Sequence, residues 1–205
     1  MANYFITGIG TNVGKTLAAA ILTEALQADY WKPIQTGAFE DNDKNTIKNL
    51  ISNTKTVFHN EIYNFKEPAS PHLAAALENK KINIETIGLP ETENNLIIEG
   101  AGGILVPLNE NNFVIDIARN LEAPIILVCQ NYLGCINHSL LSIDYLVKNE
   151  FEIHGLILNG NFDKAVKSAI INYAELPVLA EIPDLKEITR ETILTLAQKV
   201  DVSIF

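Results

Sequence analysis

Cysteine and basic residues are scarce in this sequence, and both shortages exclude certain classes of function. The 205 residues include only two cysteines, Cys129 and Cys135, which cannot build a disulfide framework and do not match the paired-cysteine spacing of zinc sites. Lysine and arginine number 15 against 25 acidic residues, so the formal net charge is −10. Coating nucleic acid or an anionic membrane requires basic surface. We therefore expect a protein of a reducing compartment that binds neither nucleic acid nor membrane.

Long apolar runs are also missing. The longest strongly apolar stretch, Ile125 to Cys129, is far shorter than the ~20 residues of a membrane-spanning helix. The first residues do not combine a basic start, an apolar run and a small-residue cleavage site, so we expect no secretory signal and a cytoplasmic location. Hydrophobic residues make up 47% of the chain, enough for a sizeable core, and no repeat or linker interrupts it. The composition predicts one domain over residues 1–205.

Short apolar runs alternate with helical patterns along the chain. The runs are continuous rather than alternating with polar residues, which is typical of strands buried on both faces in a parallel sheet. Helical spacing extends from Leu17 to Leu26 after the first run and recurs between most later ones. These patterns predict an α/β fold with a parallel sheet flanked by helices on both faces. The expected strands are 4–7, 30–32, 96–98, 125–128, 156–158 and 178–179, and the later expected helices are 114–121, 136–147, 164–173 and 189–200.

A glycine-rich segment directly after the first expected strand is the strongest functional signal. Residues 8–16 read Gly-Ile-Gly-Thr-Asn-Val-Gly-Lys-Thr and lead into a helix, which is the setting of a phosphate-binding loop (P-loop). Backbone N–H groups would hold phosphate, Lys15 would reach the β- and γ-phosphates, and the Thr16 hydroxyl would bind Mg²⁺. The loop is one residue longer than the strict pattern, because Gly8 rather than Ile9 supplies its first glycine. The alternative, an ordinary glycine-rich turn, does not explain why strand, loop, Lys-Thr pair and helix occur together.

Two further strand ends carry charged residues that suit phosphate chemistry. Glu99 ends the apolar run 96–98 and is followed by Gly-Ala-Gly-Gly, whose glycines let the backbone approach a phosphate closely. Lys32 ends another run, and its charge could stabilise a transferring phosphoryl group. Ligands of parallel sheets gather at the carboxyl ends of strands, where both residues lie. Taken alone, Glu99 could be a solvated strand end, and a surface lysine would be the better interpretation of Lys32.

The remaining polar segments are weaker signals by themselves. Asp43 lies in an acidic stretch that also suits a solvated loop or a helix N-cap. Residues 133–138 open a helix whose free N–H groups could hold a carboxylate or could belong to a simple capped start. Asn159 and Gly160 could form a turn or read a base. A Cys–His nucleophile at Cys135 has no other support, and the four histidines lack metal-ligand spacing.

Together these segments resemble the dethiobiotin synthetase family over nearly the whole chain. One phosphate loop is common to many families, whereas six ordered pieces are specific, and Gly-Cys-Ile-Asn-His is especially characteristic. The matching pieces are Gly-x-x-Thr-x-Val-Gly-Lys-Thr at 8–16, Lys-Pro-x-x-Thr-Gly at 32–37, Glu-Pro-x-Ser-Pro-His at 67–72, Glu-Gly-Ala-Gly-Gly at 99–103, Leu-Gly-Cys-Ile-Asn-His at 133–138 and Glu-Ile-Pro at 181–183. The resemblance implies a P-loop nucleoside triphosphate hydrolase-like fold.

The resemblance also implies an activity and the residues that perform it. The family joins CO₂ to 7,8-diaminopelargonic acid (7,8-diaminononanoate) with MgATP, giving dethiobiotin, ADP and phosphate in biotin biosynthesis. Carried over by residue, Lys15 and Lys32 are catalytic, and Thr16, Asp43 and Glu99 hold Mg²⁺. The other implied nucleotide-site residues are Asn12, Val13, Gly14, Gly100, Ala101, Gly102, Asn159 (which reads adenine), Gly160, Pro183, Asp184 and Leu185. The implied substrate contacts are Thr36, Gly134, Cys135 and Asn137, the turn 134–137 of one subunit completing the partner's site in a homodimer.

The sequence departs from the family pattern at several implied site positions. Gly10 and Asn12 stand where the family often has acidic residues, and Thr36 replaces a common serine while keeping the hydroxyl. Gly160 replaces a frequent aspartate, and Asp184 replaces a frequent aromatic residue beside the base. The last two leave open how strictly the protein selects ATP over CTP or GTP.

The implied reaction needs no protein nucleophile. One amine traps CO₂ as a carbamate, and the carbamate oxygen attacks the γ-phosphoryl group to give a carbamic–phosphoric anhydride. The second amine attacks the carbonyl carbon, expels phosphate and closes the cyclic urea. Positioning and electrostatic stabilisation suffice for these steps, which fits a sequence with lysines, oxygen ligands and N–H groups but no Ser–His–Asp set.

Two other P-loop functions fit the sequence less well. Partition- and cell-division-type ATPases share the first strand and loop, but their signature lysine stands where this sequence has Gly10. The sequence also lacks the terminal amphipathic helix and basic surface that such a switch on DNA or a membrane would use. An amidoligase-type synthetase needs a glutaminase domain, for which 205 residues leave no room. We therefore favour the synthetase.

Overall fold

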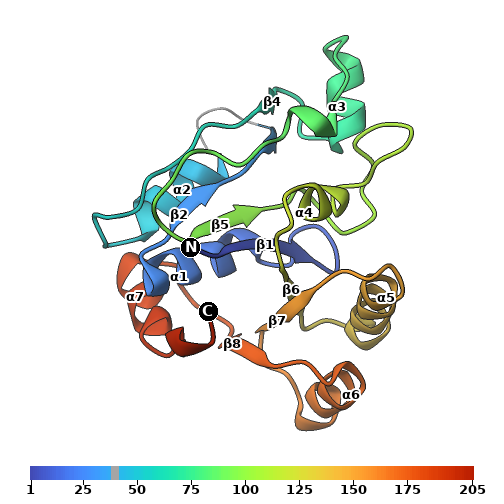
Figure 1. Cartoon of the computed structure of the whole chain (residues 1–205). Coiled ribbons are helices and arrows are strands. Elements are labelled where there is room, and N and C mark those ends of the chain that lie inside the picture. Colours follow the sequence, from blue (N-terminus) through green and yellow to red (C-terminus); the bar gives the residue numbers. More distant parts are fainter. Residues whose placement is uncertain (38–41) are drawn as a thin grey trace.

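The computed structural model describes residues 1–37 and 42–205 and confirms the expected α/β fold. Six parallel strands form the central sheet in the order β2-β5-β1-β6-β7-β8 (Figure 1). Each expected strand is present, and Lys32 lies just beyond the end of β2. The strands are β1 (Asn3–Gly8), β2 (Asp29–Trp31), β5 (Leu96–Glu99), β6 (Ile125–Gln130), β7 (Ile153–Asn159) and β8 (Val178–Ile182).

Alternate residues of each central strand enter two separate cores, which explains the continuous apolar runs. Phe5 and Leu127 belong to one core, whereas Ile6 and Ile126 belong to the other. Helices α1 (Lys15–Leu26) and α7 (Arg190–Ala197) cover one face of the sheet. Helices α4 (Asp116–Asn120), α5 (Cys135–Lys148) and α6 (Lys164–Ala174) cover the other (Figure 1). None of the helices in the described ranges is long and apolar enough to cross a membrane.

The expected helix 114–121 is shorter in the structure. Only Asp116–Asn120 is helical, because the N–H groups of Val114 and Ile115 donate to the carbonyls of Val106 and Ile104 in the preceding loop. The other expected helices begin and end within three residues of their predicted positions.

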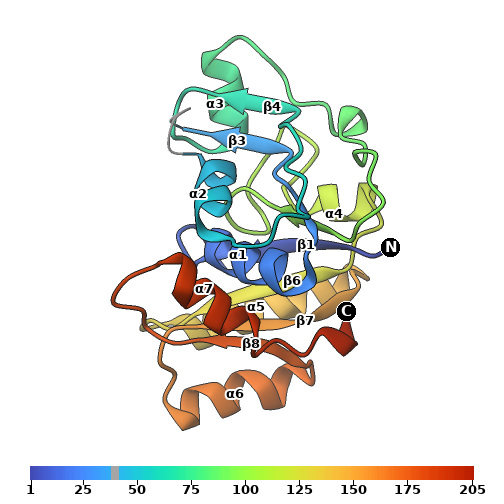
Figure 2. The ribbon, with the colours of Figure 1, turned by 90° about the vertical axis from the view of Figure 1, so that its left-hand side faces the viewer.

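Two short strands and two helices between β2 and β5 were not predicted. They form a unit beside the sheet, shown at the top of Figure 2, whose short strands pair in parallel as a second sheet. Three-residue strands and short helices leave too little periodicity to recognise in sequence. The unit consists of β3 (Ile34–Thr36), α2 (Asp43–Leu50), β4 (Tyr63–Phe65) and α3 (Pro71–Leu77). A 3₁₀ turn, η1 (Ile84–Thr86), follows the unit before β5, and a second, η2 (Val202–Ile204), follows α7.

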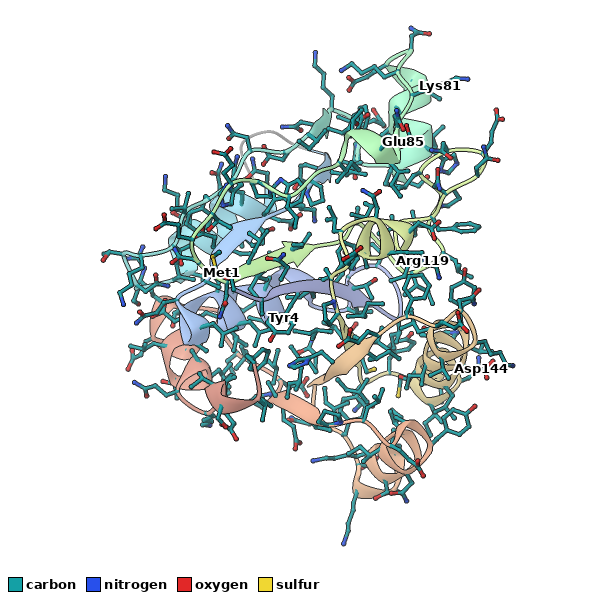
Figure 3. All side chains as sticks on the ribbon, in the orientation of Figure 1. Met1, Tyr4, Lys81, Glu85, Arg119 and Asp144 are labelled. Atoms are coloured by element: carbon teal, nitrogen blue, oxygen red, sulfur yellow. The ribbon has the colours of Figure 1, made fainter. Side chains whose placement is uncertain are left out.

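Aromatic side chains hold the edge strand β2 and the start of the central strand β1 in place. Trp31, the chain's only tryptophan, is 1% exposed, and its indole N–H donates to the carbonyl of Asn60 at 2.9 Å. In the central strand β1, Tyr4 packs against His154 and Phe205, with ring centroids 4.7 and 5.3 Å from that of Tyr4. Figure 3 shows Tyr4 inside the molecule. The C-terminal residues thereby cover the start of β1.

Candidate active site

The phosphate loop connects β1 to α1, and its shape depends on glycine. A Cβ on Gly8 would lie 2.3 Å from Val13 Cγ2, so no larger residue fits there. Gly14 has φ +93°, a conformation that other residues rarely adopt. Lys15, the first residue of α1, curls back so that its Nζ donates to the carbonyl of Gly10 at 3.0 Å. The loop therefore lies between strand and helix, as the sequence predicted, and Lys15 folds back over it.

Four side chains from four segments converge beside the loop. Thr16 Oγ1 lies 2.8 Å from Asp43 Oδ1 and 2.9 Å from Glu99 Oε1, and its single proton can be donated to only one of them at a time. Lys32 Nζ lies 2.5 Å from Asp43 Oδ2 and 3.0 Å from Glu99 Oε1. The predicted catalytic lysine thus bridges two of the predicted metal ligands.

The strand order explains this convergence. β5 lies between β1 and β2, and Trp31 pairs with Ile98, so the residues that follow, Lys32 and Glu99, are neighbours. Thr16 comes from the first turn of α1 after β1. Asp43 is the first residue of α2, whose N-cap Asn42 accepts a hydrogen bond from the N–H of Asn45 at 2.8 Å. Asp43 therefore sits at a helix N-terminus, one of the two settings its acidic stretch allowed.

Burial and charge oppose each other in this cluster. Burial alone would lower the pKa of Lys32, but the charges of Glu99 and Asp43 and their hydrogen bonds outweigh it and raise that pKa. Burial likewise opposes the charge of Asp43, yet the neighbouring Lys32 ammonium leaves the pKa of Asp43 lowered. Both members of this ion pair are therefore charged at neutral pH. Burial lowers the pKa of Lys15 to about 8 against the partly offsetting charge of Glu99.

The oxygen atoms of Thr16, Asp43 and Glu99 fit a magnesium ion. Neighbouring ligands of an octahedral ion with bonds of about 2.0–2.1 Å are about 2.9 Å apart, which matches the two distances from Thr16 Oγ1. This set differs from a metal site built from histidine, cysteine, aspartate and glutamate side chains alone, because the described residues contain no cluster of three or more of these that could hold a metal. Two carboxylates and a hydroxyl suit Mg²⁺, which retains water or phosphate oxygens as further ligands.

A cleft of about 1130 Å³ opens over the cluster and the phosphate loop. Ligand pockets commonly measure about 300–1,000 Å³, so the cleft has room for a nucleotide and a second small molecule. Residues of the segment 68–71, part of the Glu-Pro-x-Ser-Pro-His piece, also line it. The predicted site residues that line it are Asn12, Gly14, Lys15, Thr16, Lys32, Thr36, Asp43, Glu99, Ala101, Gly102 and Asn159.

Asn159 lies against the phosphate loop itself. Its Nδ2 donates to the carbonyl of Val13 at 3.0 Å and would be 2.3 Å from a Cβ on Gly14. The N–H of the next residue, Gly160, donates to Ile182 at 2.8 Å, and Asp184 Oδ1 lies 3.4 Å from the position of a Cβ on Gly160. The ends of β7 and β8 are therefore adjacent to each other and to the loop. Val13, Gly100, Gly160, Pro183, Asp184 and Leu185 are not part of the cleft lining.

The turn before α5 is separate from the cleft within this chain. None of Gly134, Cys135 and Asn137 lines it. The expectation of free N–H groups is wrong for Cys135, whose N–H donates to Tyr132 at 2.9 Å and whose side chain is buried. His138, the nearest candidate base, has its Nδ1 2.7 Å from the hydroxyl of Tyr132. A Cys–His nucleophile is thus not formed here.

Two contacts at the site were missed from sequence. The hydroxyl of Tyr30 donates to Glu99 Oε2 at 2.8 Å, and a buried tyrosine in an apolar strand is a signal that its hydroxyl needs a partner. Gly103 packs against the phosphate loop, where a Cβ would lie 3.4 Å from the Cα of Gly10. The second glycine turn therefore supports the first, in addition to any contact with phosphate.

Solved structures with the same fold identify the class of protein. The septum site-determining protein MinD from Pyrococcus horikoshii OT3, solved with Mg-ADP, superposes with a TM-score of 0.58 at 15% identity, covering 98% of this chain and 97% of that one. A ParA family ATPase from Chlorobium tepidum TLS gives a TM-score of 0.53 at 12% identity over 97% of this chain and 99% of its own. A family model described as an AAA domain matches residues 2–192. The fold and the loop define a P-loop nucleoside triphosphatase-like protein.

Sequence relatives narrow the class to one family. The ATP-dependent dethiobiotin synthetase BioD of Cytophaga hutchinsonii is 43% identical over 201 residues, covering 98% of this chain and 97% of the relative. The same enzyme of Christiangramia forsetii is 44% identical, over 89% and 87% of the two chains. The chain belongs to the ATP-dependent dethiobiotin synthetase family. The biotin biosynthesis bifunctional protein BioCD of Bordetella avium is 41% identical over 92% of this chain and 41% of its own length.

Proposed function

We propose that this protein synthesises dethiobiotin from 7,8-diaminopelargonic acid, CO₂ and ATP in biotin biosynthesis, releasing ADP and phosphate. The observation that carries the proposal is the convergence of Thr16, Lys32, Asp43 and Glu99 beside the phosphate loop, in a chain 43% identical to a synthetase of that name. The partition-type ATPases share the fold at 12–15% identity, which is a likeness of fold only.

The chain's own residues account for the chemistry by position and charge. The backbone of the phosphate loop holds the triphosphate, and Lys15 and Lys32 place two ammonium groups at its γ-phosphoryl end. The carbamate oxygen formed from one amine attacks that phosphorus and displaces ADP, and charge on the transferring group is stabilised by both lysines. The second amine then attacks the carbamic–phosphoric anhydride carbon and expels phosphate. No group of the protein becomes covalently attached.

Thr16, Asp43 and Glu99 would hold Mg²⁺ in this proposal. The ion supplies positive charge to the phosphate oxygens when it is bound. The Lys32 ammonium lies between the two carboxylates, so it partly balances their negative charge. Because the set is oxygen-only, Mg²⁺ is the ion we expect rather than zinc.

The base of the nucleotide would lie toward Asn159, whose amide offers a donor and an acceptor that match the N6 and N7 edge of adenine. Gly160 and the segment Pro183-Asp184-Leu185 would border it, supported by the adjacency of the β7 and β8 ends to the loop. Asn12, Val13 and Gly14 belong to the phosphate loop, and Gly100 to Gly102 to the second glycine turn. Nucleotide selectivity is then set by Asn159 and Asp184.

The substrate would span two subunits of a homodimer. Its amines must lie beside the γ-phosphate near Thr36, so its carboxylate falls several ångströms away and needs an anion site. The 134–137 turn is the proposed site, reached from the partner subunit; Gly134, Cys135 and Asn137 do not line their own chain's cleft. Leu133, Leu141 and Val147 are exposed apolar residues on and beside α5, next to a hollow of about 510 Å³ between α5 and residues 103–106. Such a surface suits a second copy of the chain, and we propose a cytoplasmic homodimer.

A direct assay tests the activity. The protein is incubated with MgATP, ¹³C-bicarbonate and diaminopelargonic acid, and mass spectrometry measures dethiobiotin carrying one labelled carbon together with ADP. We expect both products in equal amounts and only traces without ATP. Parallel reactions with CTP and GTP measure selectivity. ADP released without any labelled dethiobiotin, at saturating substrate, would exclude the proposed activity.

A further inference from the structure

Tyr30 is a buried residue beside the site to which the proposed reaction gives no role. It is fully buried in β2, and its hydroxyl donates to Glu99 Oε2 at 2.8 Å. Its backbone is held from outside the sheet as well: its N–H donates to Val57 at 3.0 Å, and its carbonyl accepts from His59 at 2.9 Å. The ring packs beside Phe58, with centroids 6.0 Å apart. The hydroxyl is therefore fixed in place by main-chain and ring contacts.

The pairing of β2 with β5 explains how the hydroxyl reaches Glu99. Tyr30 pairs with Ile97, and Glu99 lies two residues further along β5 on the same face of the sheet. Two residues of a strand span about 6.6 Å, a separation that the long tyrosine side chain can bridge along the strand. Phenylalanine would fill the same space without reaching the carboxylate with a donor.

The two carboxylate oxygens of Glu99 have different partners. Oε2 faces the sheet interior and accepts from Tyr30. Oε1 faces the cleft, 2.9 Å from Thr16 Oγ1 and 3.0 Å from Lys32 Nζ. With Oε2 held from behind, rotation of the carboxylate about its terminal bond would break a buried hydrogen bond. The orientation of Oε1 toward Thr16 and Lys32 is thereby fixed before any ligand enters.

We propose that Tyr30 is a positioning residue that fixes the Glu99 carboxylate, so that Oε1 stays directed at the divalent-cation position beside Thr16. The inference rests on the metal-binding role proposed for Glu99. Hydrogen-bond partners of a metal-ligating carboxylate commonly change metal affinity by about 10–100-fold when removed. Tyr30 would therefore set the affinity for the cation while leaving the transfer step itself to the residues of the cleft.

Tyr30→Phe tests this, with Mn²⁺ as the probe. Binding of Mn²⁺ to the protein with ADP is measured by electron paramagnetic resonance of the free ion, and the Mg²⁺ concentration for half-maximal activity is measured separately. We expect the dissociation constant for Mn²⁺ and the Mg²⁺ concentration for half-maximal activity each to rise about tenfold. The kcat at saturating Mg²⁺ should stay within about threefold of the wild-type value. The matched control is Tyr63→Phe, which removes a hydroxyl bonded to Thr86 at 2.9 Å in the β3–β4 unit, away from the cleft. It should leave both values unchanged.

A double-mutant cycle separates the two proposals. Glu99→Gln should weaken Mn²⁺ binding, and adding Tyr30→Phe to it should weaken binding little further, because Tyr30 acts through Glu99. If Glu99→Gln leaves Mn²⁺ binding unchanged, the proposed metal role of Glu99 fails, and the role of Tyr30 with it. If Glu99→Gln weakens binding but Tyr30→Phe does not, only the role of Tyr30 fails. If Tyr30→Phe weakens Mn²⁺ binding as much in the Glu99→Gln protein as in the wild type, the role proposed for Tyr30 likewise fails. All measurements are made below the thermal transition of each variant, so a loss of stability cannot imitate the result.

Discussion

Lys32 has the least ordinary environment of the site's residues, because one buried ammonium contacts two carboxylates. The charges of Glu99 and Asp43 raise its pKa despite the burial, so it remains a cation throughout the physiological range. A permanent, buried positive charge at the end of a strand is preorganised to stabilise a transferring phosphoryl group.

Lys32→Ala should therefore reduce kcat strongly. Losing a preorganised charge of this kind costs about 10²–10³-fold in turnover, or about 3–4 kcal/mol of transition-state stabilisation. Steady-state kinetics measure the effect, and circular dichroism checks that the variant is folded. Lys80→Ala removes a surface lysine paired with Glu78 and should retain full turnover. Near wild-type turnover of Lys32→Ala would remove that lysine from the mechanism.

His154 gives a pH dependence of stability that is independent of the active site. Burial lowers its pKa, against the opposing effects of a hydrogen bond that the imidazole donates to the backbone of Ile204 and of the charge of Glu152. Protonation thus costs more in the folded than in the unfolded state. The stability contribution is complete above the ordinary histidine pKa of about 6.5 and is lost as the pH falls through the lowered value.

The expected result is a smaller acid-induced loss of stability in His154→Phe, which keeps a ring between Tyr4 and Phe205. Urea unfolding at pH 7.5, 6.5 and 5.5 measures the free energy of unfolding of both proteins. The wild type should lose stability relative to the variant between pH 6.5 and pH 5.5. If the free energies of unfolding of the two proteins change equally with pH over the whole range, His154 titrates in the folded protein as it does in the unfolded chain.

At the scale of single residues, sequence alone located the charged groups but not their partners. Lys15 and Thr16 followed from the loop pattern, and Glu99 from its place at the end of a buried strand. Asp43 depended on the family resemblance, because its position follows from a packed helix rather than from local pattern. Tyr30 was missed because it has the appearance of an ordinary core residue until the register of β2 against β5 is known.

Among the elements, the phosphate loop is the most constrained. Gly14 joins the loop to α1 with φ +93°, and the space for its missing Cβ is occupied by Asn159 Nδ2 at 2.3 Å. Asn159, at the end of β7, therefore packs against the loop and holds it in place. A side chain at this position would both strain the backbone and displace Asn159.

Gly14→Ala should abolish tight nucleotide binding. The left-handed conformation alone costs about 1–3 kcal/mol for a non-glycine residue, and displacement of Asn159 adds to it. Isothermal titration with MgADP measures the affinity, which we expect to fall at least tenfold. Gly88→Ala is the control, since a Cβ there meets nothing within 4 Å. Unchanged affinity of Gly14→Ala would mean that the loop adopts another conformation when nucleotide binds.

The elements themselves were predicted in proportion to their length and burial. Long apolar strands and amphipathic helices followed from periodicity, and their ends were close to those observed. β3, β4, α2 and α3 were missed, because their short segments are fixed by contacts with distant residues. The unit they form carries Thr36 and Asp43, so one side of the cleft depends on structure that local pattern does not reveal.

For the whole molecule, the strand order gathers the site at one end and leaves the α5 turn outside it. Lys32 and Glu99 come from the neighbouring strands β2 and β5, whereas the turn before α5 follows β6 on the other side of β1. A site that uses both the cleft and this turn is easiest to build from two subunits related by symmetry.

Mixed dimers test the composite site. Cys135 is buried, so the exposed neighbour Asn137 is the better residue to change without disturbing the core. Lys15→Ala and Asn137→Trp proteins should each be inactive. After subunit exchange, one site per heterodimer has both halves intact, and activity should partly return. Absence of recovery in heterodimers confirmed by native mass spectrometry would show that each subunit binds its substrate alone.

The burial of Trp31 has a practical consequence. The chain has a single tryptophan, and it lies immediately before Lys32 and immediately after Tyr30. Its indole is shielded and hydrogen-bonded to Asn60. Intrinsic fluorescence excited at the indole therefore reports on one strand end only, the one that supplies Lys32 to the cleft. The protein carries its own optical probe for whether the Lys32 end of β2 is in place, without any label or added dye.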